Sequence, residues 1–356
     1  MPKIRVLIVD DSALVRQLLT EILNQDDAIE VVGVAADPYI AREKIKQLEP
    51  DVLTLDVEMP KMDGITFLAN LMRLHPMPVV MVSTLTDKGA DVTLQALELG
   101  AIDYVSKPKS DLASSLESYA EEITSKIKIA AKANVRAINR EARSLNASEK
   151  YDADVILEKV KRNHFKTTEK IIAVGASTGG TEAIKEFLIR LPADTPGIVI
   201  TQHIPSAFSG PFAKRMDSLS KMKVFEARDG QQIIPGHVYI APGDQHLIVE
   251  RNGARYICRL NSGPPVNRHR PSVDVLFRSV AQTVGPNSIG IILTGMGDDG
   301  AAGLKELHDS GAKTIAQDEK TSVVWGMPGE SVKRGGVDYI LPLEEIPGKA
   351  LKLVTD

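Results

Sequence analysis

The first 108 residues alternate short apolar runs with amphipathic segments. The apolar runs are continuous, which is typical of strands buried on both faces in a parallel sheet covered by helices. The segments between them, such as 14–23 and 91–100, repeat apolar residues at helical spacing. The pattern predicts an N-terminal (βα)5 domain with a five-stranded parallel sheet. The predicted strands lie at residues 5–9, 30–36, 51–55, 78–82 and 103–107.

A second series of apolar runs and helical patterns begins after residue 170. We predict a larger, doubly wound and mostly parallel α/β domain there. Turn residues at 243–244 and 252–253 predict antiparallel hairpins inserted into this domain. The predicted strands lie at residues 170–176, 197–202, 237–243, 246–250, 288–295 and 313–318.

Residues 110–170 differ in character from both halves of the chain. An amphipathic helical segment leads into a stretch that is rich in charge and poor in large apolar side chains, which is typical of a linker. We therefore predict a domain at residues 1–125, a linker at 126–168 and a second domain at 169–356.

Composition narrows the classes of function. The chain has 356 residues, enough for two cores, and its net charge of -4 provides no general attraction to nucleic acid. A single cysteine excludes an internal disulfide, and no Cys or His cluster has zinc spacing. The apolar run near the N-terminus is too short for a signal peptide or a membrane span. We expect a cytoplasmic protein that does not insert into membranes and that acts on a protein or a small molecule.

Five polar residues follow the strands of the first domain. They are Asp10 and Asp11, Asp56, Ser83 and Lys107. Because the carboxyl ends of parallel strands meet at one edge, these side chains are expected to converge there. Carboxylates brought close together favour a hard cation such as Mg²⁺, which leaves one of them free to accept a phosphoryl group. The alternative is that each acid only caps a helix or solvates a turn.

The same region resembles the receiver domain of two-component response regulators. The resemblance rests on the motifs "LIVDDSALVRQLL", "LDVEMPKMDG", "VVMVSTLT" and "DYVSKPK" and covers residues 1 to about 125. It implies that Asp56 is phosphorylated and that Asp10, Asp11, Asp56 and the backbone carbonyl of Glu58 hold Mg²⁺. In such domains Ser83 and Lys107 would contact the phosphoryl group. Tyr104 would be an aromatic switch whose burial reports phosphorylation, or else an ordinary residue at the sheet edge.

Three reactive side chains follow strands of the second domain: Ser177, His203 and Asp299. A serine hydroxyl needs an imidazole to remove its proton, and the imidazole needs a carboxylate to fix its tautomer. Small residues around Ser177 match G-x-S-x-G, but the order Ser, His, Asp differs from that of α/β-hydrolases. A structural turn or a phosphate loop is the alternative for Ser177 alone, and the chain lacks the usual phosphate-loop motifs.

The second domain resembles the catalytic domain of the CheB family of chemotaxis protein-glutamate methylesterases. The resemblance rests on "AVGASTGGTEAI", "ITQHIP", "YIAPGDQHL", "HRPSVDVLF" and "ILTGMGDDGAAGL". It implies a nucleophile at Ser177, a general base at His203, its orienting acid at Asp299, and an oxyanion region lined by Thr178 and Met296. One departure is Asp298, where the family usually has Asn.

The resemblance implies a phosphorylation-activated esterase that releases methanol from methylated glutamates of chemoreceptors and also deamidates glutamine. Its partners would be methyl-accepting chemotaxis receptors and a chemotaxis histidine kinase, and the esterase step would need no metal. The receiver would inhibit the second domain until Asp56 is phosphorylated. Two alternatives remain: a non-enzymatic response regulator with a protein-binding output domain, and a hydrolase of small esters.

Residues 269–274 also carry polar side chains, which stay outside the predicted catalytic set. His269 is a possible substrate-side residue. Ser272 and Asp274 are interpreted first as an N-cap and as an acid that complements a helix dipole.

Overall fold

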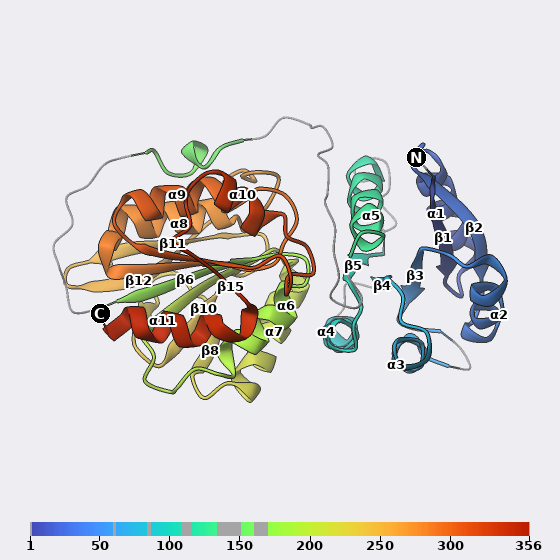
Figure 1. The fold of residues 1–356 in the computed structure, drawn as a ribbon, viewed down its shortest axis with the longest axis horizontal. Coiled ribbons are helices and arrows are strands. Elements are labelled where there is room, and N and C mark those ends of the chain that lie inside the picture. The colour runs from blue at the N-terminus through green and yellow to red at the C-terminus, as the bar shows by residue number, and fades with distance from the viewer. Residues whose placement is uncertain are drawn as a thin grey trace. The chain divides into compact units, whose positions relative to one another are not determined.

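The computed structural model describes residues 2–59, 62–83, 87–107, 116–133, 151–159 and 170–355. The chain divides into two compact units, residues 1–140 and 141–356, which are described separately (Figure 1). The domain boundaries expected from the sequence stay predictions. Among the described residues, no helix combines the length and apolar character that crossing a bilayer requires.

The N-terminal unit contains the predicted five-stranded parallel sheet, with strand order β2-β1-β3-β4-β5. The central strands are buried along their whole length, which explains their continuous apolar sequence. Register pairs Val9 of β1 with Leu55 of β3, so the acids that follow or end these strands lie at one edge. The strands are β1 (Ile4–Val9), β2 (Ile29–Ala35), β3 (Val52–Asp56), β4 (Val79–Ser83) and β5 (Asp103–Ser106).

Five helices flank this sheet, with α1 and α5 on one side and α3 and α4 on the other (Figure 1). Ser12, Asp37 and Asp63 cap three of them, because each side chain accepts a hydrogen bond from an amide three residues later. The helices are α1 (Ala13–Asn24), α2 (Pro38–Leu48), α3 (Gly64–Leu74), α4 (Asp87–Glu98) and α5 (Leu116–Ala130).

The C-terminal unit is built on a seven-stranded parallel sheet with the order β15-β14-β13-β6-β7-β10-β8. From β6 the chain first builds outward through β7, and it later returns to add β13 on the other side of β6. This reversal makes the carboxyl ends of β6 and β13 a topological switch point, the usual position of a ligand site in such sheets. The strands are β6 (Ile171–Ala176), β7 (Gly197–Gln202), β8 (Lys223–Glu226), β10 (His237–Ile240), β13 (Ser288–Ile292), β14 (Lys313–Gln317) and β15 (Tyr339–Leu341).

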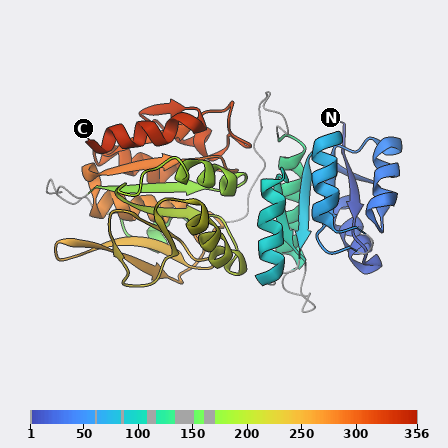
Figure 2. The ribbon, with the colours of Figure 1, turned by 90° about the horizontal axis from the view of Figure 1, so that it is seen from below.

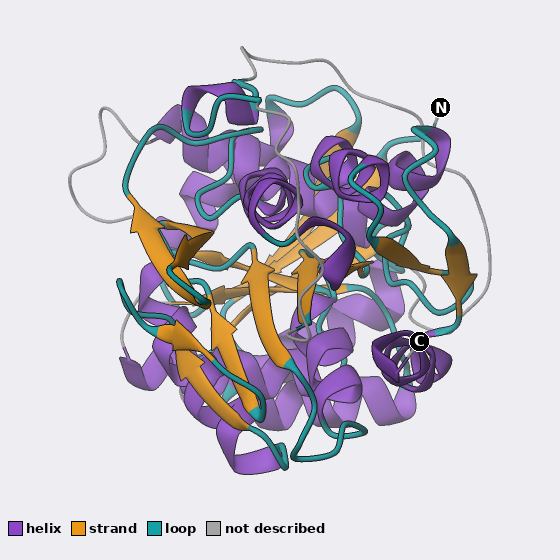
Figure 3. Ribbon diagram, turned by 90° about the vertical axis from the view of Figure 1, so that its left-hand side faces the viewer, coloured by secondary structure: helices purple, strands orange, loops and turns teal. Residues whose placement is uncertain are grey.

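Helices cover both faces of this sheet, as the doubly wound prediction requires (Figures 2 and 3). Helices α8, α9 and α10 lie on one face, and α6, α7 and α11 lie on the other (Figure 1). Their bounds are α6 (Gly180–Leu188), α7 (Ser206–Leu219), α8 (Val273–Thr283), α9 (Ala301–Asp309), α10 (Met327–Lys333) and α11 (Ile346–Thr355), with single 3-10 turns η1 (Ala153–Val155), η2 (Gly285–Asn287) and η3 (Leu343–Glu345).

A separate three-stranded antiparallel sheet, β11-β12-β9, contains the predicted hairpin at 252–253. It is formed by β9 (Gln232–Ile233), β11 (His246–Asn252) and β12 (Arg255–Asn261). Asn252 pairs with Arg255, and Gly253 between them has a φ of 62°, in the left-handed region that favours glycine.

The hairpin predicted at Gly243–Asp244 is wrong. Strand β10 pairs in parallel with β7 and β8 instead of folding back on β11. Gly243 is small for another reason: an added Cβ would lie 2.1 Å from the amide nitrogen of Ser206, at the start of α7. The glycine therefore permits close packing of two backbones.

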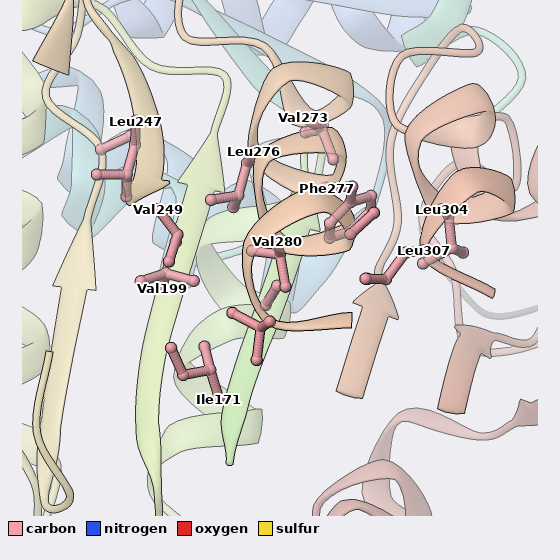
Figure 4. Packing of buried hydrophobic residues seen from close by; sticks show 14 of the residues in the cluster. Ile171, Val199, Leu247, Val249, Val273, Leu276, Phe277, Val280, Leu304 and Leu307 are labelled. Atoms are coloured by element: carbon pink, nitrogen blue, oxygen red, sulfur yellow. The ribbon is translucent and has the colours of Figure 1, made fainter. Parts of the chain in front are cut away.

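Helix α8 occupies the centre of the C-terminal core (Figure 4). Leu276, Phe277 and Val280 are fully buried in one cluster with residues of the parallel sheet, of the small sheet and of α9. Burial of each such side chain stabilises the fold by about 1.5–3 kcal/mol. This packing fixes the N-terminus of α8, where the Val273 amide donates to Asp299 in the loop after β13.

Residues 151–159 of the predicted linker pack against the C-terminal unit. Ala153 is 1% exposed and shares a small apolar cluster with Val266 and Val275. The buried guanidinium of Arg278 in α8 pairs with Asp152 and Asp154 of this segment. We call residues 151–159 the docked segment.

Candidate active site

Ser177 follows the carboxyl end of β6 in the large sheet, where the strand passes through a tight turn into α6. Gly179 in this turn has a φ of 75°, which a residue with a Cβ rarely adopts. Gly180 begins α6, and an added Cβ there would meet the side chain of Gln202 at 2.1 Å. The Ser177 amide donates to the carbonyl oxygen of Thr294 at 3.0 Å, which ties the serine to the loop after β13.

The structure brings Ser177, His203 and Asp299 into one hydrogen-bonded chain. The Nδ1 atom of His203 lies 3.0 Å from the hydroxyl of Ser177, and its Nε2 atom lies 2.8 Å from a carboxylate oxygen of Asp299. Because the carboxylate can only accept, Nε2 carries the ring proton and the lone pair of Nδ1 faces the serine. The imidazole is thereby poised to remove the serine proton.

Asp299 is 1% exposed and surrounded by donors. Besides His203, its oxygens accept hydrogen bonds from the amide of Val273 at 2.7 Å and from the Ser272 hydroxyl and the Asn267 amide group, each at 2.8 Å. Burial alone would raise the pKa of this carboxyl, but the hydrogen bond and charge of His203 and the Asn267 donor hold the pKa below its usual range. The group is therefore a stable anion.

Ser272 is at the predicted N-cap position of α8, but no cap hydrogen bond forms from its side chain. Its hydroxyl donates to Asp299 instead. Asp274 lies in the first turn, as expected from the sequence, and is only 4% exposed. Burial and the nearby charge of Asp299 raise the pKa of Asp274 to about 7.

Two residues beside the His203–Asp299 pair lie outside the predicted catalytic set: His269, which was interpreted from the sequence only as a substrate-side residue, and Asn267, which sequence reasoning missed. The ring of His269 stacks on that of His203 with centroids 3.7 Å apart, and Asn267 donates to Asp299. Both residues lie in a loop where Asn267 and Arg268 have positive φ values of 50° and 70°. The only available signal was the density of polar residues in "NRHRPSVD", which does not reveal such a loop geometry.

The remaining predicted residues of this site lie around the serine. Thr178 is 7% exposed, and its carbonyl accepts from the Thr294 hydroxyl at 3.0 Å. Met296 is 39% exposed and follows Gly295, whose backbone packs against Ser177. Asp298 faces Arg334, with a guanidinium nitrogen 3.5 Å from its carboxylate. Of the two adjacent aspartates, it is therefore Asp299 that bonds to His203.

A second cluster lies at the sheet edge of the N-terminal unit. Asp10, Asp11 and Asp56 each offer an oxygen within 4.8 Å of the others. The Lys107 ammonium lies 3.0 Å from Asp10 and 2.8 Å from Asp56. Burial raises the pKa of Asp56 to about 6, with the Asp10 charge adding to the effect and Lys107 opposing it.

The donor set of this cluster fits a magnesium ion. Carboxylate oxygens are ligands that Mg²⁺ prefers, and the three acids bring theirs within 4.8 Å of one another. Asp10 and Asp56 are buried, whereas Asp11 is exposed, so the cluster is open to solvent on the side of Asp11. Glu58 donates its amide to Asp56 at 3.3 Å, and the role of its carbonyl stays a prediction.

The two remaining receiver residues are buried. Ser83 ends β4 with 1% exposure, and its carbonyl accepts from the Lys107 amide at 2.6 Å. Tyr104 is 5% exposed, with the Lys126 ammonium 5.0 Å from its ring centroid. The contact roles of Ser83 and Lys107 and the switch role of Tyr104 stay predictions.

Comparison with known proteins agrees with both halves of this architecture. A model of the response regulator receiver domain matches residues 6–117, and a model of the CheB methylesterase matches residues 172–350. The second match alone covers half of the chain. The chain belongs to the CheB methylesterase family.

Relatives match over nearly the whole length. A protein-glutamate methylesterase/protein-glutamine glutaminase of Hydrogenovibrio crunogenus is 60% identical over 99% of this chain and 100% of its own. A protein of Xanthomonas euvesicatoria with the same description is 59% identical, covering 98% of this chain and 97% of its own. The solved CheB methylesterase catalytic domain of Thermotoga maritima is 39% identical with a TM-score of 0.51, covering 52% of this chain and 98% of that domain.

Proposed function

We propose that this CheB family member is a phosphorylation-activated protein-glutamate methylesterase that also deamidates protein glutamine. The observation that carries the proposal is the hydrogen-bonded chain from Ser177 through His203 to the buried anion Asp299. Such a chain is built to generate a nucleophilic serine. The names of the close relatives supply the substrate class.

The first half of the reaction forms an acyl-enzyme. The Ser177 hydroxyl oxygen attacks the ester carbonyl carbon of a methylated glutamate, and its proton passes to Nδ1 of His203. Asp299 stabilises the resulting imidazolium through the Nε2 hydrogen bond. Negative charge develops on the carbonyl oxygen in a region that we assign to Thr178 and Met296. Because the Ser177 amide already donates to Thr294, other donors serve this oxyanion.

The second half releases product and restores the enzyme. The imidazolium returns its proton to the leaving oxygen, and methanol departs. Water then attacks the acyl carbon while His203 removes its proton, and His203 passes that proton to the Ser177 oxygen as the acyl–serine bond breaks, which yields a free glutamate and the serine hydroxyl. A glutamine amide follows the same path, with His203 protonating the departing nitrogen so that ammonia leaves. Every proton in this scheme moves through His203.

Regulation is assigned to the receiver unit. We propose that Asp56 accepts the phosphoryl group and that Asp56, Asp10, Asp11 and the Glu58 carbonyl would hold Mg²⁺, which would offset charge during transfer. Lys107 already pairs with Asp56 and Asp10, so it can neutralise the phosphorylated state. Phosphorylation would shift the chain from an inhibited to an active population.

The proposed partners follow from the same family membership. The substrate would be a methyl-accepting chemotaxis receptor, and a chemotaxis histidine kinase would donate the phosphoryl group. A non-enzymatic output domain would not require a serine–imidazole–carboxylate chain, so the site geometry favours the enzyme. A hydrolase of small esters would share the same chemistry and differ only in its substrate.

Methanol release from methylated receptor membranes tests the esterase proposal. We expect release by the wild-type chain, stimulation by a small phosphodonor with Mg²⁺, and a loss of at least about 10³-fold in Ser177→Ala. Ser218→Ala is the matched control, because that hydroxyl only donates to the Arg215 carbonyl on the surface of α7. Wild-type rates in Ser177→Ala would overturn the assignment of Ser177 as the nucleophile. Methanol release from small esters but not from receptor membranes would favour a hydrolase of small esters.

A further inference from the structure

A single side-chain amide joins two buried carboxylates behind the catalytic histidine. Nδ2 of Asn267 lies 2.8 Å from Oδ1 of Asp299 and 2.6 Å from Oδ2 of Asp274. An amide nitrogen carries two hydrogens, so it can donate one to each carboxylate. Asp299 and Asp274 are 1% and 4% exposed, so solvent provides little screening between them.

This amide has an electrostatic role that other neighbours do not share. Two close carboxylates in a protein interior repel each other, and donors directed at both relieve the repulsion. Asp274 otherwise accepts from the amide of Gly303 in α9, and the charge of Asp152 in the docked segment also acts on it. The charges of His203 and His269, in contrast, act on Asp299 and lower its pKa. Within the part of the chain that the structure describes, Asn267 is the side chain that donates to both acids.

The backbone of Asn267 is held in an unusual conformation. Its φ of 50° lies in the left-handed region, which asparagine tolerates better than most residues. The backbone amide of Asn267 donates at 2.9 Å to the carbonyl of Tyr151, the first described residue of the docked segment. Val266, immediately before it, packs on Ala153 of the same segment. The position of Asn267 therefore depends on part of the predicted linker.

We infer that Asn267 is a positioning residue for the catalytic carboxylate of Asp299, and that the docked segment, residues 151–159, keeps it in place. The inference rests on the proposed esterase function. Asn267 touches no reacting atom, and it acts by fixing the anion that orients His203. The linker thus contributes to the geometry of the esterase site as well as joining the two units.

The first test uses Asn267→Gly and Asn267→Asp in the full chain with saturating phosphodonor and Mg²⁺. Glycine keeps the left-handed backbone accessible, so this variant removes the side-chain amide without straining the backbone. Leaving a buried charged group short of a donor costs about 1–3 kcal/mol, so we expect kcat to fall roughly 10- to 100-fold with little change in KM. Aspartate adds a third carboxylate and should reduce kcat further. Asn252→Gly, in the exposed hairpin turn, is the matched control.

The pH profile separates positioning from a merely structural role. At low pH the Asp299–His203 pair takes up a proton and can no longer act as a base. Without the Asn267 donor the pair binds this proton more tightly, so the acidic limb of kcat/KM should move to higher pH. The rate at which a fluorophosphonate labels Ser177 should fall in parallel and needs no receptor. Unchanged pH limbs and labelling rates in a stably folded Asn267→Gly chain would overturn the inference.

A second test addresses the docked segment. Ala153→Arg places a charged side chain in the apolar cluster with Val266 and should release the segment, whereas Val155→Arg changes a residue that is 47% exposed. We expect Ala153→Arg, but not Val155→Arg, to slow Ser177 labelling, and adding Asn267→Gly to cause little further loss. Equal labelling in both arginine variants, or fully additive losses, would contradict the role of the segment.

The two proposals fail in distinguishable ways. Labelling of Ser177 without methanol release from receptors would refute the proposed substrate and leave the positioning role measurable. Normal methanol release and labelling in the Asn267 variants would refute the positioning role alone.

Discussion

The backbone of Gly295 lies directly against Ser177: a Cβ added to this glycine would be 2.8 Å from the serine Cβ. The same added atom would lie 2.3 Å from the sulfur of Met327 at the start of α10. Gly295 therefore has a packed neighbour on each side. The loop after β13 can approach Ser177 because this position lacks a side chain.

We expect Gly295→Ala to slow methanol release strongly while the protein still folds. The added methyl forces either the flexible Met327 or the serine turn to shift, and a displacement near 1 Å at a nucleophile can cost about 10²-fold in rate. Overpacking costs about 1–3 kcal/mol of unfolding free energy. Methanol release and thermal unfolding measure both effects. Gly348→Ala is the control, because a Cβ there meets nothing within 4 Å, and equal activity in the two variants would contradict the packing argument.

The polar residues after the strands were the most predictable part of the site. Ser177, His203 and Asp299 each follow a strand of one parallel sheet. Local sequence patterns that locate the strand ends therefore suffice to predict that these side chains lie at the same edge of the sheet. The same argument places Asp10 and Asp56 beside Lys107. In both cases the predicted grouping depends on strand ends, which apolar runs locate well.

The surroundings of Asp299 were not predictable in this way. Asn267 and His269 reach the site through a loop with left-handed residues, whose course no periodic pattern encodes. The wrong hairpin at Gly243 has a related cause, because a glycine needed for close packing resembles a glycine needed for a turn. The continuous apolar run at β10 was the better signal, since it indicates a strand buried in the parallel sheet.

Removal of the metal should affect the proposed phosphorylation of the N-terminal unit but not the unstimulated esterase activity of the C-terminal unit. We expect EDTA to abolish phosphorylation by a small phosphodonor and its stimulation of methanol release, while leaving the unstimulated rate within about twofold, since proton transfer through His203 needs no metal. Asp56→Asn should remove the same stimulation without chelator. Phosphate incorporation and methanol release provide the measurements. An unstimulated rate that fell with EDTA and recovered with Mg²⁺ would contradict the assignment of the metal to the receiver.

The charge of Asp298, which adjoins Asp299 in the chain, should have little influence on catalysis. Asp298 faces Arg334 at 3.5 Å, and both side chains are partly exposed, so the pair contributes at most about 1 kcal/mol. We expect Asp298→Asn to keep kcat within about twofold and to leave the pH limbs in place. A pH-rate profile of methanol release is the check. A clear shift of the acidic limb would mean that the Asp298 charge acts on His203 after all.

The buried carboxyl of Asp274 should make the stability of the C-terminal unit fall as pH rises from about 4 to about 7. Its pKa rises from the ordinary value of 3.8 to about 7 in the folded protein, chiefly through burial. Between these values the folded chain binds a proton that the unfolded chain has released, so stability decreases with increasing pH and levels off above the folded pKa. Asp299 has the opposite sign, because its lowered pKa contributes stability that is lost only as pH falls below about 4.

Comparison of the wild type with Asp274→Asn isolates this effect, because the other titrating groups are common to both chains. We expect the difference in unfolding free energy to change by up to about 1.4 kcal/mol per pH unit between pH 4 and 7, with the wild type losing stability relative to the variant. Trp325 is the only tryptophan and lies in the C-terminal unit, so its fluorescence during urea unfolding reports on this unit. Parallel stability curves for the two chains would show that Asp274 is ionised throughout this range, and that Asn267 and Gly303 stabilise its charge fully.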